Sequence, residues 1–126
     1  MISEQIERRI YTKEATPIEQ LARFSEVLGG PTIYIKRDDL LGLTGGGNKT
    51  RKLEYLMADA LKNGADTIVT CGALQSNHCR LTLAAAVKEG LHCQLVLQEH
   101  AHRKFDEQAL GNQQIFKLLG AEQLHI

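Results

Sequence analysis

The sequence predicts an α/β protein: an open, mostly parallel, twisted sheet with helices on both of its faces. Two observations favour this class. Short apolar runs with β-branched residues alternate with longer segments whose apolar residues recur at helical spacing. The links between these segments are short and contain glycine, which is typical of strand–helix–strand units with a right-handed crossover.

The first expected helix begins at residues 16–19, Thr-Pro-Ile-Glu. Thr16 can cap this helix, Glu19 can complete a capping box, and Pro17 suits the first helical position. Gly29-Gly30-Pro31 ends the helix. Residues 32–36 then alternate β-branched and aromatic side chains, which predicts a strand that leads into Arg37-Asp38-Asp39.

A second helix is expected from Thr50, because apolar residues repeat at helical spacing up to a stop at Asn63-Gly64. The remaining elements alternate, and the expected ones are strand 67–70, helix 81–87, strand 93–97, helix 112–119 and a strand that begins at 124–126. No helix follows that last strand, although a parallel sheet normally has both faces covered. We therefore expect the front part of a larger α/β protein, or a piece that needs a partner.

Composition excludes several classes of function. The 126 residues include 15 acidic and 15 basic side chains, so no overall charge attracts nucleic acid or acidic lipid. No apolar run approaches the roughly 20 residues that span a membrane, and the charged segment 1–13 lacks an apolar signal core. The three cysteines show no metal-binding or paired spacing, which indicates reduced thiols and a cytoplasmic location. His100 and His102 alone make a poor metal site, so no metal is expected.

A glycine loop opens the second helix, in residues 45–52, Gly-Gly-Gly-Asn-Lys-Thr-Arg-Lys. It nearly matches the phosphate-binding P-loop, but Asn48 puts Lys49 out of register by one residue, which argues against an NTPase. Glycines still let the backbone approach a flat ring or a phosphate closely, and the helix start offers free N–H groups to an anion. Taken alone, the loop slightly favours a solvated basic turn before a helix.

A second polar loop, residues 72–78, leaves the expected strand 67–70 at the edge where α/β sheets bind ligands. Ser76 and Asn77 fall at a helix start, where both are also good caps. The run from Gln75 to His78 is more polar than a cap requires. An amine on one helix start and a hydroxyl–amide pair on the next favour an amino-acid site.

Residues 45–56 and 72–80 together closely resemble the family of D-cysteine desulfhydrase and 1-aminocyclopropane-1-carboxylate deaminase. These are tryptophan-synthase-β-like, fold type II enzymes that depend on pyridoxal 5'-phosphate. The resemblance runs from about Thr16 to the end and covers about the first third of a family member. It implies that residues 1–48 join a larger domain, and that residues 49–126 form a small α/β domain truncated at its C-terminal end.

The resemblance implies that the amine of Lys49 bonds covalently to pyridoxal phosphate and then acts as the base at the substrate Cα. It also implies that Asn77 binds the ring hydroxyl and that Asn48 and Lys52 contribute to the cofactor site. The chemistry agrees, because neighbouring cations such as Arg51 and Lys52 make a lysine amine a better nucleophile. The resemblance further implies that Ser76, with the amides near Asn77 and His78, holds the substrate carboxylate.

Within the family, His78-Cys79 after the second loop resembles the D-cysteine desulfhydrase branch, which implies β-elimination of D-cysteine to pyruvate, ammonia and sulfide. Three alternatives stay open. Two are other enzymes, 1-aminocyclopropane-1-carboxylate deaminase and cysteate sulfo-lyase, and the third is a non-catalytic, truncated domain that binds the cofactor or an amino acid. The resemblance also implies a homodimer for the full-length protein and a hydrogen-bonded turn, not a cation site, at Asp38-Asp39. The 126-residue chain alone is expected to be inactive.

Overall fold

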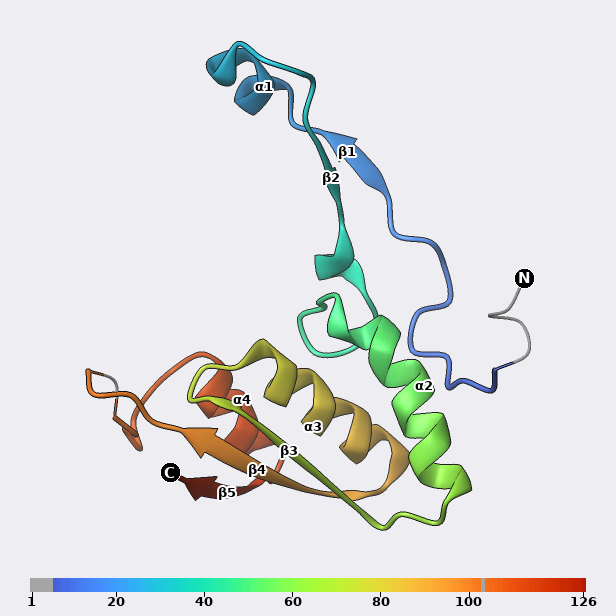
Figure 1. The fold of residues 1–126 in the computed structure, drawn as a ribbon, viewed down its shortest axis with the longest axis vertical. Helices are drawn as coiled ribbons and strands as arrows, with labels where there is room; N and C mark the ends of the chain where they lie inside the picture. The colour runs from blue at the N-terminus through green and yellow to red at the C-terminus, as the bar shows by residue number, and fades with distance from the viewer. Residues whose placement is uncertain (1–5, 103) are drawn as a thin grey trace.

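The computed structural model describes residues 6–102 and 104–126, so the first five residues of segment 1–13 and Arg103 lie outside the described residues. Five strands, four α-helices and one 3-10 turn follow one another in the described part of the chain (Figure 1). They are β1 Ile18–Gln20, α1 Ala22–Leu28, β2 Tyr34–Lys36, the turn Asp38–Leu40, α2 Lys49–Lys62, β3 Thr67–Ala73, α3 Asn77–Glu89, β4 His92–Gln98, α4 Asn112–Leu118 and β5 Glu122–His125.

The main sheet is parallel, with strand order β3-β4-β5. Thr67 lies opposite His92 and Gln94 opposite Glu122, and every residue of β3 pairs with β4. Helix α3 contacts both β3 and β4, and α4 contacts α3, so both crossover helices cover the same face. Right-handed crossovers between successive neighbouring strands place their helices in this way. The predicted α/β class with a parallel sheet is confirmed.

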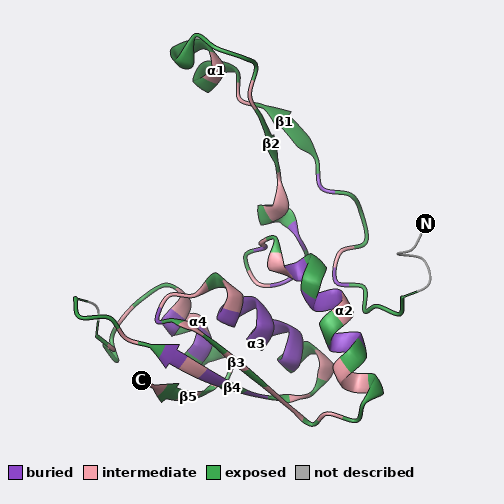
Figure 2. Cartoon of the chain, in the orientation of Figure 1, coloured by how far each residue is buried: buried purple, intermediate pink, exposed green. Residues whose placement is uncertain are grey.

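The core lies in two clusters on the two sides of α3. The first fills the space between α3, α4 and the sheet, and its buried members are Leu74, Cys79, Leu83, Ala86, Cys93, Leu95, Leu97 and Phe116. The second joins α3 to α2, and its buried members are Tyr11, Leu43, Leu53, Met57, Leu81, Ala84 and Ala85. Helix α3 is therefore buried on almost every side (Figure 2), and it fixes α2 relative to the sheet.

The N-terminal segment binds α2 through one buried carboxylate. Glu54 Oε1 accepts hydrogen bonds from the backbone N–H groups of Tyr11 (2.9 Å) and Thr12 (3.1 Å). The backbone carbonyl of Glu54 accepts from Arg9 N at 2.8 Å. Tyr11 also places its ring in the second core cluster, so this segment is part of the folded core.

The predicted helix start at Thr16 is wrong. Residues 18–20 instead form β1, which pairs antiparallel with β2, and the helix begins only at Ala22. Thr16 Oγ1 donates to the carboxylate of Asp38, so the hydroxyl caps no helix. The pairing of Ile18 with Lys36 outweighs the local capping signal, because a hairpin satisfies the same backbone groups.

The other predicted elements are present with shifted ends. Strand 32–36 is reduced to Tyr34–Lys36, and strand 67–70 extends to Ala73 because β4 pairs along its whole length. Helix 81–87 begins earlier, at Asn77, because Ser76 caps it. The polar start of this helix lacks the apolar repeat on which the prediction relied.

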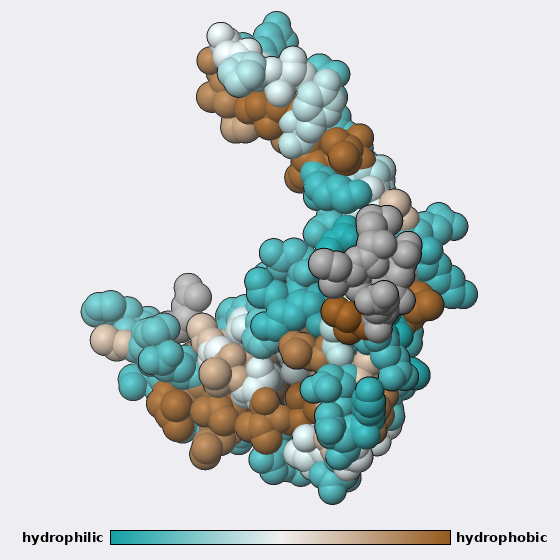
Figure 3. Space-filling view, turned by 45° about the vertical axis from the view of Figure 1, so that its right-hand side comes forward, coloured by the Kyte–Doolittle hydropathy of each residue, from teal (hydrophilic) through white to brown (hydrophobic). Residues whose placement is uncertain are grey.

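One face of the sheet is open within residues 6–102 and 104–126, where no helix packs on it. Val69 and Leu124 are exposed there, and Val96 between them is half-buried. Apolar side chains also gather on the β1–α1–β2 hairpin, which projects from the remainder of the fold (Figures 1 and 3). Among the described residues, no helix has both the length and the hydropathy of a membrane span.

Candidate active site

Lys49 is the first residue of α2 and follows directly on the glycine loop. The loop backbone is fixed by hydrogen bonds from Gly46 N to Leu43 O and from Gly47 N to Asp38 O, both 2.7 Å. Lys49 is half-buried, and none of the described residues forms a hydrogen bond or ion pair with its amine. The fold thus holds the backbone of this lysine in place and leaves its Nζ available.

The loop needs glycine because neighbouring atoms come too close for a side chain. A Cβ at Gly45 would lie 2.3 Å from Nη1 of Arg80, and one at Gly46 would lie 1.9 Å from the backbone oxygen of Asp39. Gly45 also has a φ of +63°, which disfavours any other residue. The triple glycine therefore serves close packing of the loop between α3 and the turn Asp38–Leu40.

Arg80 holds this loop against α3. Its guanidinium donates to the backbone oxygens of Thr44 and Gly46. The residue is 8% exposed, no described carboxylate pairs with it, and burial lowers its pKa below the usual value. Arg80 N also donates to Ser76 O at 3.2 Å, one helical turn back. One residue thus joins the loop of Lys49 to the start of α3.

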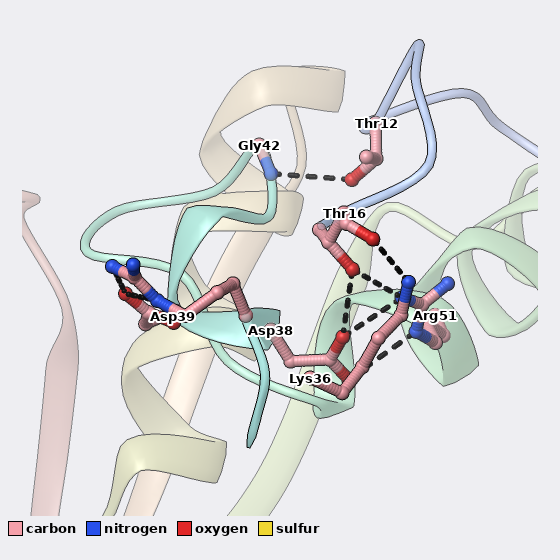
Figure 4. A network of polar contacts seen from close by, with 8 residues as sticks. Thr12, Thr16, Lys36, Asp38, Asp39, Gly42 and Arg51 are labelled. Atoms are coloured by element: carbon pink, nitrogen blue, oxygen red, sulfur yellow. Dashed lines mark hydrogen bonds and ion pairs between the residues drawn. The ribbon is translucent and has the colours of Figure 1, made fainter. Parts of the chain in front are cut away.

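Asp38 holds the same loop from the opposite side (Figure 4). Its backbone oxygen accepts from Gly47, and its carboxylate accepts from Arg51 Nη2 at 2.8 Å and from Thr16 Oγ1 at 3.2 Å. The hydrogen bond from Arg51 is the main reason why the pKa of Asp38 lies below its usual value. The predicted hydrogen-bonded turn is confirmed. The charge of Arg51 is offset by Asp38, so Arg51 is a weaker influence on Lys49 than the sequence predicts.

Ser76 caps α3, as its position predicts, and keeps a proton to donate. Its Oγ accepts a hydrogen bond from Cys79 N at 3.2 Å. A cap uses only an oxygen lone pair, so the hydroxyl hydrogen can still be donated to a ligand. A Cβ at Gly72 would lie 2.6 Å from this Oγ, which shows how closely β3 and the cap approach.

His78, in the first turn of α3, is under the electrostatic influence of two of the three lysines of α2, Lys49 and Lys52. Its Nε2 is 3.0 Å from Thr70 Oγ1, and its Nδ1 is buried without a partner among the described residues. Burial lowers the pKa of His78 most, and the charges of Lys52 and Lys49 lower it further. The lowered pKa favours the neutral imidazole at pH 7. The contact that holds the two helix starts together is that of Arg80 with the glycine loop.

Asn112 is a site residue that the sequence reasoning missed. Its Nδ2 donates to the backbone oxygen of Gln75 at 2.8 Å and to Oδ1 of Asn77 at 2.9 Å. Its backbone N–H donates to Oε1 of Gln75, also at 2.8 Å. The only sequence signal is a Gly-Asn pair before a helix, which by itself indicates no more than a turn.

The predicted site residues therefore lie on two neighbouring helix starts. Lys49 is the first residue of α2, with the exposed Asn48 before it and the exposed Lys52 three residues after it. Ser76, Asn77 and His78 lie at the start of α3, which follows the C-terminal end of β3. An available amine can form a Schiff base with a carbonyl ligand, and a hydroxyl and helix N–H groups suit a carboxylate. These donors fit pyridoxal phosphate bound with an amino acid. The described residues contain no cluster of three metal-ligating side chains.

A parallel α/β fold that presents an available lysine amine beside a polar helix start is typical of proteins that bind an aldehyde cofactor covalently. The model of the family described as pyridoxal-phosphate dependent enzyme matches residues 11–126. The chain belongs to this family, and the predicted family and cofactor are confirmed.

The chain is similar to curated bacterial proteins named D-cysteine desulfhydrase. It is 62% identical over 84 residues to that of Yersinia enterocolitica serotype O:8 and 61% identical over 84 residues to that of Serratia proteamaculans. Each alignment covers 67% of this chain and 25% of the relative. The aligned part thus spans about a quarter of the length of these relatives.

Two solved structures share the fold. A crystal structure of an ACC deaminase homologue superposes with a TM-score of 0.87 at 43% identity, and the match covers 98% of this chain and 36% of that one. A pyridoxal 5'-phosphate-dependent aspartate racemase superposes with a TM-score of 0.63 at 22% identity, covering 98% of this chain and 34% of that one. The second likeness concerns the fold alone.

Proposed function

We propose that the full-length protein is a pyridoxal-phosphate-dependent lyase that converts D-cysteine and water into pyruvate, ammonia and sulfide. The observation that carries the proposal is the joined pair of helix starts, with Lys49 on one and Ser76 and Asn77 on the other. It is supported by 62% identity over 84 residues to proteins named D-cysteine desulfhydrase. Residues 72–80, whose sequence resembles that branch, form part of this joined pair.

In this proposal Lys49 forms the covalent bond to the cofactor and, once released from it, moves the proton at the substrate Cα. The bound cofactor would supply the electron sink for that carbanion. The support is the half-buried position of Lys49 at the start of α2 and an amine without a partner among the described residues. An amine already engaged in an ion pair would be a poor nucleophile.

The substrate carboxylate is assigned to the start of α3. Ser76 donates its free hydroxyl hydrogen, and the backbone N–H groups near Asn77 and His78 add donors. The helix N-terminus favours the negative charge. Removal of the Ser76 hydroxyl is expected to weaken substrate binding. A displaced carboxylate would also move the Cα hydrogen away from Lys49, so Ser76 is assigned a catalytic role as well as a binding role.

The cofactor ring is assigned to Asn77, and Asn48 and Lys52 are assigned to the same site from the start of α2. The support for Asn77 is that its Oδ1 is already occupied by Asn112, so its NH₂ group is the free end. The support for Lys52 is that it is exposed and lies three residues after Lys49, on the same side of the first turn of α2.

We propose that residues 1–48 join a larger domain and that residues 49–126 form a small one. The support is the β1–α1–β2 hairpin, where Val27 is 83% exposed and Ile18 66% exposed. Such apolar exposure marks a surface that another part of a protein covers. A small domain without that larger one lacks part of the cofactor site, so we propose that the described chain alone is inactive.

The second candidate activity is 1-aminocyclopropane-1-carboxylate deamination, which the similarity to an ACC deaminase homologue at 43% identity favours. Cysteate sulfo-lyase activity and non-catalytic binding of the cofactor or an amino acid are two further candidates. For location we propose the cytoplasm, supported by three cysteines without a disulfide among them. For assembly we propose a homodimer, supported by the family resemblance alone, and light scattering tests it.

The deciding experiment uses the full-length protein with four substrates: D-cysteine, L-cysteine, cysteate and the cyclopropane amino acid. D-Cysteine is expected to give pyruvate and sulfide in equal amounts, and 1-aminocyclopropane-1-carboxylate to give little product. Lys49→Ala is expected to remove the visible cofactor band, and borohydride is expected to bleach that band in the wild type. Elimination that persists in Lys49→Ala would refute the proposal.

A further inference from the structure

The side chain of Asn77 can be turned in two ways, and the choice decides what it offers to a ligand. One end of the amide is an acceptor oxygen and the other is an NH₂ donor. Only the hydrogen-bond network around the amide distinguishes the two orientations. In this protein the network is anchored on backbone atoms, whose donor and acceptor roles are fixed.

The anchor is the backbone oxygen of Gln75, which can only accept. The atom of Asn112 that lies 2.8 Å from it must therefore be Nδ2. The second hydrogen of this NH₂ group points at an atom of Asn77, 2.9 Å from Nδ2 of Asn112. That atom must be an acceptor, so it is Oδ1. Nδ2 of Asn77 consequently faces away from Asn112, and no described residue accepts a hydrogen bond from it.

Asn112 is itself held in place by its own backbone. Its N–H donates to Oε1 of Gln75 at 2.8 Å, and Nε2 of Gln75 donates to the backbone oxygen of Leu110 at 2.9 Å. Gly111, before Asn112, has a φ of +75°, and a Cβ there would lie 2.9 Å from Oε1 of Gln75. Each amide in this chain of contacts has one possible orientation.

We propose that Asn112 is a positioning residue that fixes Asn77 with its NH₂ group toward the ring hydroxyl of pyridoxal phosphate. This inference rests on the proposed role of Asn77. The ring oxygen is stabilised as an anion by a donor, whereas an amide oxygen in the same place would repel it. Without Asn112 the amide of Asn77 can turn, and the donor is lost for part of the time.

The test uses full-length holoprotein without substrate and follows the visible cofactor band as a function of pH. Asn77→Ala removes the donor and is expected to move the titration midpoint to higher pH by about one to two units. Asn112→Ala is expected to move it in the same direction. Asn112→Asp is expected to move it at least as far, because a carboxylate cannot donate to Asn77. The double variant Asn77→Ala/Asn112→Ala is expected to match Asn77→Ala alone.

Gly111→Ala reaches the same contacts through the backbone and is expected to shift the midpoint as well. Its matched control is Gly120→Ala at the other end of α4, where φ is +72° and a Cβ has no neighbour within 4 Å. Gly111 combines a φ of +75° with a ψ of −135°, a conformation that other residues rarely adopt, so Gly111→Ala adds backbone strain to the contact with Gln75. Gly120→Ala shows the effect of a side chain at a positive φ where no contact is disturbed. Circular dichroism confirms that each variant is folded.

A wild-type midpoint in Asn112→Ala, beside a shifted one in Asn77→Ala, would overturn the inference and leave the proposed function intact. An equal shift in Gly111→Ala and Gly120→Ala would also overturn it. An unshifted midpoint in Asn77→Ala would refute the assigned role of Asn77 and this inference together. A visible band that survives Lys49→Ala would refute the proposed function itself.

Discussion

Replacement of Arg80 by methionine is expected to loosen the glycine loop and to leave the free energy of unfolding nearly unchanged. Methionine keeps the unbranched apolar stem of the side chain and removes the guanidinium with its charge and donors. Two hydrogen bonds from a charged donor, to Thr44 O and Gly46 O, contribute about 3–6 kcal/mol. Against this, a buried cation without a partner among the described carboxylates costs several kcal/mol.

These opposing contributions nearly cancel, so Arg80→Met is expected to change the free energy of unfolding by less than about 2 kcal/mol. The loop, in contrast, loses its attachment to α3. We expect amide hydrogen exchange at Gly46, Gly47 and Thr50 to accelerate about tenfold or more. The assay is exchange mass spectrometry of the full-length protein, beside urea unfolding. Unchanged exchange in this loop, or a loss of more than about 4 kcal/mol, would refute the reasoning.

Three further predictions concern strain, core packing and pH. In urea unfolding, Gly45→Ala is expected to destabilise the protein by about 1–3 kcal/mol more than Gly29→Ala, because only at Gly45 does a Cβ meet the guanidinium of Arg80. The two glycines have similar φ values, +63° and +61°, so equal losses of stability would contradict this prediction. Phe116→Ala, at a side chain with 0% exposure, is expected to cost about 3–5 kcal/mol in the same assay. His78→Gln is expected to weaken the loss of stability below about pH 6.5, because a lowered pKa in the folded state means that the unfolded chain binds more protons there.

The parallel part of the fold could be predicted because its signals are local. β-Branched and apolar runs form β3 and β4, and Asn63-Gly64 ends α2 where the pattern predicts. The start at Thr16 could not be predicted in this way. Its capping box is a valid local signal, but a strand that begins 18 residues further along, at Tyr34, pairs with the same backbone, and a sequence window does not include that partner.

The site was predictable to a similar extent. Lys49, Ser76 and Asn77 lie on recognisable loops, so their positions at two helix starts follow from the sequence. Arg80 and Asn112 did not stand out, because each acts on a loop that is remote in sequence. Arg80 reaches back 36 residues to Thr44, and Asn112 reaches back 35 residues to Asn77. Such long-range hydrogen bonds can be identified only when the tertiary contacts are known.

The open sheet face has a practical consequence for anyone who produces these residues by themselves. Val69 and Leu124 form an exposed apolar surface on which another molecule can pack. The edge strands β3 and β5 also have unpaired backbone groups that can hydrogen-bond to strands of other molecules. At high concentration the isolated polypeptide should precipitate or form fibrils, detectable by turbidity and dye binding. A charged residue in place of Val69 should raise its solubility, while the same change in the full-length protein should impair folding if that face is covered there.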